Sequence, residues 1–371
     1  PACARKPCAF SEKWTRKPRP RLSTTKLPPR LRACTLPIVP TVATARLSRA
    51  LLTLVGLAIL LCVVVVLRLN TGPTPTPDAA ELVMSLRTDR VVMGATVGAA
   101  LAVAGVLLQA LLRNPLASPD LLGLGSGAGL GVMVVVYAAY LAGLGIAATS
   151  VGGGVGWTTT SAAIAGALGA LALVYVLSQR KGLLDPVTLV LIGVVISIMC
   201  GAAISLLKTL MPDQGLAASR LLMGTLSDDV PRTRVWAVGG LTLACTALGA
   251  WAGPAMDAAA LGEDEARSVG VRIGPLRTLL FVLSGVLTAG SVVLAGPVGF
   301  VGLICPHAVR LLAGPGHRVL VIGAALAGAI LVIGADAATR LIDFGSGHPP
   351  ISILTSLIGG PVLVLLLRRS R

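Results

Sequence analysis

The sequence has few charged and few aromatic residues for its length. Only 12% of its 371 residues are charged and 3% are aromatic, whereas 55% are hydrophobic and the mean hydropathy is +0.88. In soluble globular domains about a quarter of the residues are charged. This scarcity of charge excludes a soluble enzyme domain, a disordered regulator and a small secreted module built on disulfides. The composition is that of an integral membrane protein.

Motifs for catalysis, nucleotide binding and metal binding are also missing. No glycine is followed by lysine, so there is no GxxxxGK[ST] loop, and HExxH is absent. The seven cysteines form no CxxC pair and have no ligand spacing with the three histidines. We therefore predict no catalytic residue, no metal site and no cofactor bound by this chain. Asp336 is the only acid well inside an apolar run, so proton-coupled secondary transport lacks its usual groups.

The formal charge of +16 comes mainly from the N-terminal part of the chain. Residues 1–49 contain twelve Lys or Arg against one acid, Glu12. Residues 1–45 are rich in Pro, Arg, Lys and Thr without helical periodicity, which predicts a disordered basic tail ahead of a membrane domain at 46–371. Fold and aromatic signals for nucleic-acid binding are missing, so we predict no nucleic-acid partner.

Apolar runs predict about ten membrane segments. A spanning helix needs roughly 20 apolar residues, because a ~30 Å hydrocarbon layer is crossed at 1.5 Å per residue. The run at 297–309 is too short to cross unaided and predicts a short or tilted segment. The predicted segments are 51–67, 91–112, two within 121–179 separated near Gly152, 187–207, 235–253, 278–295, 297–309, 319–341 and 351–367.

The distribution of basic residues predicts the orientation. With both termini inside, 13 Lys or Arg lie in cytoplasmic flanks and eight in the opposite flanks. Residues 254–277 are then the one long polar connection on the cytoplasmic side after the first segment. Acidic residues at its start and arginines toward its end match the dipole of a charged helix-turn. The connection is either a solvated loop or a docking surface for a cytoplasmic partner.

Three stretches carry a resemblance to a known family. RNPLASPDLLGLGSGAGLG begins at Arg113, GEDEARSVGV at Gly262 and GPVGFVGLICPHAVR at Gly296. In this order they resemble the signature stretches of the iron-siderophore and cobalamin importer permeases, the FecCD-type (BtuC-like) membrane subunits of ATP-binding-cassette transporters. The resemblance covers residues 51–371. The matching motif positions are Arg113, Asn114, Pro115, Gly296, Pro297, Pro306 and His307.

The resemblance implies an all-α integral membrane protein with the type II ABC importer permease fold. It implies a second permease subunit, identical or paralogous, two cytoplasmic ATPase subunits that use ATP and Mg²⁺, and an extracytoplasmic substrate-binding protein. The segment 187–210 matches the span that lines the pathway, and 215–227 matches the outer gate helix. The ATPase-coupling positions that it implies are Gly262, Glu263, Glu265, Ala266, Arg267 and Gly270, and the positions that dock the binding protein are Arg87, Arg90 and Arg340.

The expected function is that of a transport subunit and not of an enzyme. The resemblance is strongest to ferric-siderophore permeases, so we expect a ferric siderophore to be moved across the cytoplasmic (inner) membrane by a multi-pass chain with cytoplasmic termini. Cobalamin and haem are alternative cargoes. A proton-coupled transporter and a membrane scaffold that moves nothing are the other classes left open.

Overall fold

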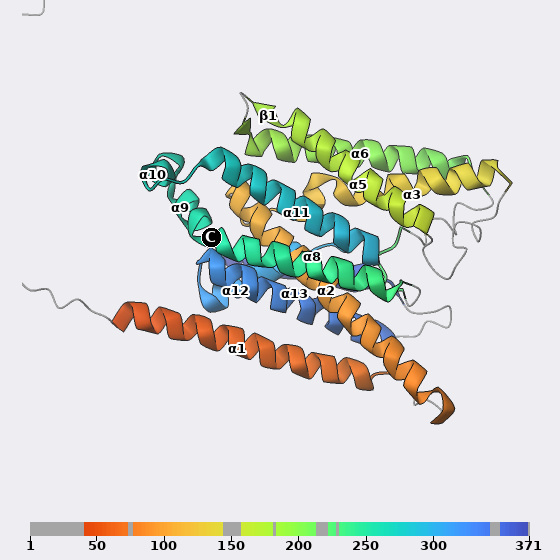
Figure 1. The fold of residues 1–371 in the computed structure, drawn as a ribbon, viewed down its shortest axis with the longest axis horizontal. Helices are drawn as coiled ribbons and strands as arrows, with labels where there is room; N and C mark the ends of the chain where they lie inside the picture. Colours follow the sequence, from red (N-terminus) through yellow and green to blue (C-terminus); the bar gives the residue numbers. More distant parts are fainter. Residues whose placement is uncertain are drawn as a thin grey trace, which may run out of the picture. The chain divides into compact units, whose positions relative to one another are not determined.

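A computed structural model describes residues 41–72, 77–143, 157–180, 183–212, 222–227, 230–341 and 349–369. This part of the chain is a bundle of helices with one two-stranded hairpin (Figure 1). The first half comprises α1 (Thr41–Asn70), η1 (Pro77–Ala79), α2 (Ala80–Leu112), η2 (Pro119–Leu122), α3 (Leu124–Leu141), α5 (Trp157–Leu177), β1 (Gln179–Arg180), β2 (Leu183–Leu184) and α6 (Pro186–Thr209). The second half comprises α8 (Arg232–Trp251), α9 (Gly253–Leu261), α10 (Glu263–Ser268), α11 (Ile273–Ala295), α12 (Val301–Ala313), α13 (His317–Leu341) and α14 (Ile351–Arg369).

The helices account for all ten predicted membrane segments. Among the described residues, seven helices are long and apolar enough to span a membrane, and α8 with α9 forms an eighth candidate bent by 49°. The two shorter apolar helices are α12 and the described part of α14, Ile351–Val362. The short segment predicted at 297–309 is therefore α12, whose 13 residues are too few to cross alone. The expected break near Gly152 falls outside the described residues.

Two boundaries differ from the sequence prediction. Helix α1 begins at Thr41, so residues 41–45 of the predicted tail are helical, while residues 1–40 lie outside the described part of the chain. Helix α2 begins at Ala80 and not near residue 91. Arg87 and Arg90 consequently lie within this long helix, and arginine is a good helix former.

Helix α2 is the centre of the bundle, and small residues allow this. Its apolar window is 83% buried, compared with 11% for that of α1. A Cβ on Gly98 would meet the carbonyl of Gly328 in α13, and one on Gly105 would meet the carbonyl of Gly302 in α12. Within a membrane, such contacts between backbones supply the packing that the hydrophobic effect does not. The glycines therefore set the distance between α2 and its neighbours.

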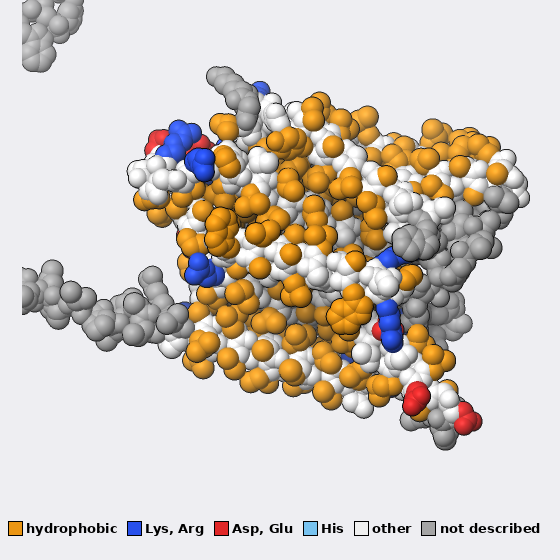
Figure 2. Space-filling model, in the orientation of Figure 1, with side chains coloured by type: hydrophobic (Ala, Val, Ile, Leu, Met, Phe, Trp, Pro, Cys, Tyr) orange, Lys and Arg blue, Asp and Glu red, His pale blue; other side chains and the backbone are white. Residues whose placement is uncertain are grey.

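Charged side chains gather at the two ends of the bundle, and the surface between them is apolar (Figure 2). One end carries α9, α10 and the β1–β2 hairpin, and we call it the α10 face. Helix α13 starts at this face, where its first residue, His317, contacts Asp257 of α9. Asp336 is 19 residues further along α13, roughly 28 Å away at 1.5 Å per residue. We call that opposite end the Asp336 face.

Candidate functional site

The predicted loop at 254–277 is a pair of short helices and the first turns of α11. Helix α9 ends at Leu261, α10 follows at once from Glu263, and α11 already begins at Ile273. Gly262 joins α9 to α10, and a Cβ there would collide with the Glu265 carboxylate. Gly270 ends the turn after α10 with a φ of 85°, a conformation that favours glycine. Gly270 thus has a conformational reason for its position, whereas at Gly262 the Glu265 side chain could move aside.

Burial and capping fix this helix-turn to the bundle. Ala266 of α10 is fully buried, so the short helix packs against its neighbours on the side that carries this residue. On α9, one oxygen of Asp257 accepts a hydrogen bond of 3.0 Å from the backbone N–H of His317 and lies 2.6 Å from His317 Nδ1. Asp257 thereby caps the N-terminus of α13, where four N–H groups lack helical partners.

Glu263 lies among three arginines from three different elements. Its carboxylate is 2.5 Å from Arg277 of α11, 3.7 Å from Arg267 of α10 and 4.0 Å from Arg113 at the end of α2. We call these four residues the Glu263 cluster. The side chain of Arg277 is 13% exposed and that of Glu263 is 37% exposed, so the pair is partly shielded from solvent. The cluster brings together positions that belong to two of the three sequence motifs.

The first motif ends α2 and turns the chain back into the bundle. Arg113 has a φ of 49° at the end of the helix, and the carboxamide oxygen of Asn114 accepts a 2.9 Å hydrogen bond from the N–H of Leu116. Pro115 disfavours helical geometry at the residue before it. Asn114 and Pro115 therefore shape the turn, and the turn places Arg113 beside Glu263.

Gln109 joins the first and third motifs, and the sequence analysis missed it. It is 2% exposed within α2, and its oxygen accepts a 3.1 Å hydrogen bond from Arg310 of α12. Its nitrogen donates to the carbonyls of Ala117 and Gly302, each at 3.4 Å. One polar residue in the charge-free run at 91–112 was the available signal.

Replacing Gln109 with leucine should lower the stability of the folded chain by about 1–3 kcal/mol, because Arg310 and two carbonyls lose a buried partner. The thermal midpoint in detergent measures the effect. Gln179→Leu in the exposed hairpin is the matched control and should change stability by less than about 0.5 kcal/mol. Equal midpoints for both variants would contradict the structural role of Gln109.

The remaining positions of the third motif lie where α11 ends and α12 begins. Gly296 ends α11 with a φ of 70°, and the backbone N–H of Thr225 donates to the carbonyl of Ala295 just before it. Pro297 follows and contributes to a hollow. Pro306 and His307 lie within α12, and Pro306 is buried. In the described part of the chain, no group of three or more His, Cys, Asp or Glu side chains is placed to hold a metal ion.

A hollow of about 350 Å³ lies between α3 and α6. Its wall from α3 consists of Gly125, Ser126 and Gly129, and α6 contributes Ile204. Asp120 of η2 is the acidic residue of the lining, and its carboxylate accepts a 3.0 Å hydrogen bond from Ser118. Helix α6 corresponds to the predicted pathway span at 187–210. Most of the predicted gate segment at 215–227 lies outside the described residues.

At the Asp336 face, a buried acid links three helices. Asp336 of α13 forms an ion pair with Arg68 of α1, and both side chains are at most 4% exposed. The guanidinium of Arg90 in α2 lies 3.4 Å from the other oxygen of Asp336. The one acid inside an apolar run therefore bonds two neighbouring helices. Its main partner, Arg68, was not foreseen.

The structure brings two of the three predicted docking arginines close together and places the third nearby. Arg90 and Arg340 line a cavity of about 160 Å³ together with Asp336. Arg87 donates a 2.8 Å hydrogen bond to the carbonyl of Leu69 at the end of α1. Arg87 and Arg90 therefore also hold the bundle together, and their docking role stays a prediction.

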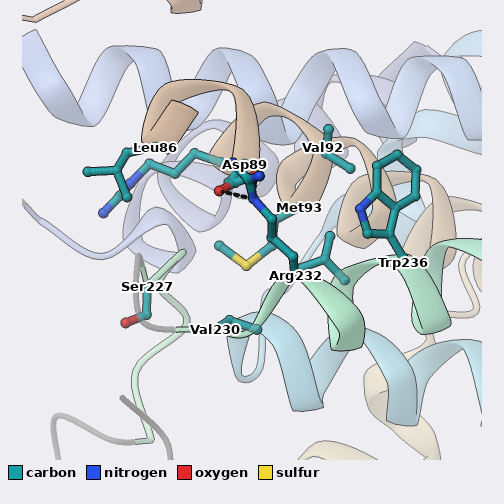
Figure 3. Close-up of a pocket in the computed structure, with 10 residues that line it drawn as sticks. Leu86, Asp89, Val92, Met93, Ser227, Val230, Arg232 and Trp236 are labelled. Atoms are coloured by element: carbon teal, nitrogen blue, oxygen red, sulfur yellow. Dashed lines mark hydrogen bonds and ion pairs between the residues drawn. The ribbon is translucent and has the colours of Figure 1, made fainter. Parts of the chain in front are cut away.

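A further contact at this face closes a small pocket between α2 and α8 (Figure 3). Arg232 at the start of α8 pairs with Asp89 of α2 at 2.8 Å, and Met93 and Trp236 line the same pocket. Its volume of about 20 Å³ is close to that of one water molecule. The pocket has no room for a cargo and is a packing feature.

Apolar spans with a charged helix-turn at one face are the architecture of a multi-pass membrane protein. Residues 50–369 match the sequence profile of the FecCD transport family, and the chain belongs to this family. It is thus an ABC importer permease of the FecCD type, a multi-pass membrane protein and a transport subunit. The predicted fold class is confirmed.

Similar proteins carry several cargo names. The chain is 36% identical over 293 residues to the cobalamin import system permease protein BtuC of Halobacterium salinarum, covering 79% of this chain and 75% of that protein. It is 35% identical over 302 residues to the hemin transport system permease protein HmuU of Yersinia pestis, covering 80% and 86%. A solved chain described as a metal-chelate type ABC transporter in an inward-facing conformation is 29% identical, with a TM-score of 0.74 over 86% of this chain and 99% of that chain.

Proposed function

We propose that this chain is the permease of an importer that carries a metal chelate across the cytoplasmic membrane, driven by separate ATPase subunits. The Glu263 cluster is the observation that carries the proposal. It joins a helix-turn at the surface to the ends of α2 and α11, so a force on α10 acts on two helices of the bundle at once. In the proposed orientation of the chain in the membrane, the α10 face and both termini are on the cytoplasmic side.

The proposed partners follow from the same assignment. Two ATPase subunits bind ATP and Mg²⁺ beneath the α10 face, and a second permease subunit, identical or paralogous, forms the other wall of the pathway. A binding protein delivers cargo at the Asp336 face. ATP binding closes the ATPase pair, α9 and α10 move with it, and the pathway opens alternately to each side. No covalent step occurs in this chain.

A ferric siderophore is the proposed cargo, because the stretch RNPLASPD from Arg113 resembles most closely the corresponding sequences of ferric-siderophore permeases. Cobalamin is the second candidate, and the name of the Halobacterium relative favours it. The name of the Yersinia relative favours haem in the same way. The hollow between α3 and α6 supports a pathway at this place for any of these chelates.

Reconstitution tests the proposal. The chain is purified with its candidate ATPase and binding protein, placed in liposomes, and supplied with ferrichrome, cyanocobalamin or haemin. ATP-dependent accumulation of ferrichrome that needs every component is the expected result. Accumulation of cyanocobalamin or haemin alone would reassign the cargo. Absence of any uptake together with absence of a stable ATPase complex would overturn the importer assignment.

Arg340→Glu should weaken docking of the binding protein. An ion pair near the surface contributes about 0–1 kcal/mol, and reversing the charge replaces this attraction with a repulsion of similar size, so the Kd should rise roughly three- to tenfold. The effect should grow as ionic strength falls, since salt screens exposed charges. Arg87 and Arg90 also bond Leu69 and Asp336 within the bundle, so replacing either of them would disturb helix packing as well as docking. A Kd that is unchanged at low salt would remove Arg340 from the docking surface.

A further inference from the structure

The guanidinium of Arg277 contacts two elements that are far apart in the sequence. One terminal nitrogen, Nη2, lies 2.5 Å from the carboxylate of Glu263 in α10. The other, Nη1, donates a 3.4 Å hydrogen bond to the carbonyl of Leu184 in the β1–β2 hairpin. The side chain is 13% exposed, so protein atoms cover most of it. A single side chain therefore connects α10 with the hairpin.

The hairpin leads directly into α6. Its strands pair antiparallel, and the N–H of Asp185 donates to the carbonyl of Ser178 across its open end. The Asp185 carboxylate caps α6 by accepting a 3.0 Å hydrogen bond from the N–H of Thr188. Hydrogen bonds from Thr188 are the main reason why the pKa of Asp185 is lowered, and the positive charges of Arg180 and Arg277 add to the effect. The position of Leu184 thus sets where α6 begins.

The geometry of arginine couples the two contacts. The guanidinium is planar and rigid, so one terminal nitrogen cannot swing without carrying the other. Arg277 is also fixed at its base, because α11 is buried from Leu276 onward through residues such as Leu280 and Phe281. A displacement of α10 must therefore either break the contact with Glu263 or turn the guanidinium away from the Leu184 carbonyl.

We propose that Arg277 is a positioning residue that ties the place of α10 to that of the hairpin before α6. Movement imposed on α10 then reaches the start of the pathway helix through one side chain. Two other contacts of this helix-turn lead elsewhere, Asp257 to α13 and Arg113 to α2, while Gly274 of α11 packs on Leu183 of the hairpin without a polar contact to α10. The inference rests on the proposed function, since it assumes that the ATPase moves α10.

Arg277→Lys and Arg277→Gln test the proposal in the full complex. Lysine keeps the charge but presents a single nitrogen, so it can hold Glu263 without holding Leu184 at the same time. Both variants are reconstituted with the ATPase and binding protein. ATP hydrolysis and accumulation of the ferrichrome, cyanocobalamin or haemin that the wild type transports are measured together. The matched control is Arg180→Gln, which removes a cation from the exposed strand β1 without touching α10.

Arg277→Lys should hydrolyse ATP within about twofold of the wild type, while cargo moved per ATP falls about fivefold or more. In Arg277→Gln, the cargo moved per ATP should fall at least as far. In Arg180→Gln, both ATP hydrolysis and cargo moved per ATP should stay within about twofold of the wild type. If Arg277→Lys transports as much cargo per ATP as the wild type, the two simultaneous contacts of the guanidinium have no role in coupling. A parallel loss of hydrolysis and transport would also overturn the proposal, because it would indicate a general defect of the helix-turn.

Hydrogen exchange separates this inference from the proposed function. In the wild-type complex, ATP binding should change the exchange of the Leu184 and Asp185 amides, and in Arg277→Lys this change should disappear. An identical change in both proteins would refute the connection even if transport is found. Absence of uptake of all three chelates together with absence of a stable ATPase complex would overturn the importer proposal, and the positioning role with it.

Discussion

Replacing Asp336 with alanine should prevent most of the protein molecules from reaching a stable fold. The substitution leaves the guanidinium of Arg68, 3% exposed, without its carboxylate. Removing one partner of a buried ion pair costs about 3–5 kcal/mol, a large part of the 5–15 kcal/mol by which proteins are stable. The effect should be greatest on α1, whose window is only 11% buried and which also depends on Arg49 bonding the last carbonyls of α12. Folded yield in detergent and the thermal midpoint measure it.

Two variants separate loss of the pair from loss of an acid. Asp264→Ala removes a carboxylate that is 96% exposed and should leave the yield unchanged. The double substitution Arg68→Leu with Asp336→Leu should recover much of the yield, because an apolar pair avoids the cost of desolvating a charge. If the double variant were as unstable as Asp336→Ala, the unpaired arginine would not be the cause.

Glu263→Arg should separate ATP hydrolysis from transport. The change places a fourth positive charge beside Arg113, Arg267 and Arg277, where attraction now holds the elements together. Uptake per ATP should fall about tenfold or more, in line with a coupling free energy of 1–3 kcal/mol. The measurement is simultaneous hydrolysis and accumulation in proteoliposomes, with co-purification of the ATPase as the check on assembly.

The controls for this variant use charge reversals elsewhere. Arg267→Glu, one helical turn after Glu263, should have a smaller effect because the Arg267 side chain is 58% exposed and its contacts are 3.7 Å or longer. Glu81→Arg reverses an exposed acid in the first turn of α2 at the other end of the bundle and should not alter coupling. Normal uptake per ATP by Glu263→Arg would remove the cluster from the mechanism.

The membrane made most of the fold predictable. Its thickness sets the length of each apolar run, so the ten segments followed from counting, and even α12 was recognised by being short. A charged helix-turn was foreseen within 254–277 because acids and arginines are spaced along this connection, but its division into α9 and α10 was not. The β1–β2 hairpin was not foreseen, because its four residues have no pattern that hydropathy can detect.

The contacts of the site depended on distances along the chain that no local pattern encodes. Arg68 was visible as a charge at the edge of one apolar run and Asp336 as an acid inside another, but 268 residues separate them. Arg113 and Glu263 were both assigned to motifs, yet only the packing of α2 against α11 shows that they meet. Gln109 gave one weak signal, a polar side chain in an apolar helix, which its contacts with α12 now explain.

The backbone contacts at Gly98 and Gly105 also determine which parts of the molecule can move. At these two glycines the backbones of neighbouring helices lie in direct contact, and no side chain between them can change rotamer to absorb a shift. We therefore expect α2, α12 and α13 to keep their spacing during transport. In the proposed alternating cycle, these three helices should move as one unit without sliding against one another. Relative motion within the chain is then to be sought among α3, α5 and α6, and labels for observing motion belong on that side.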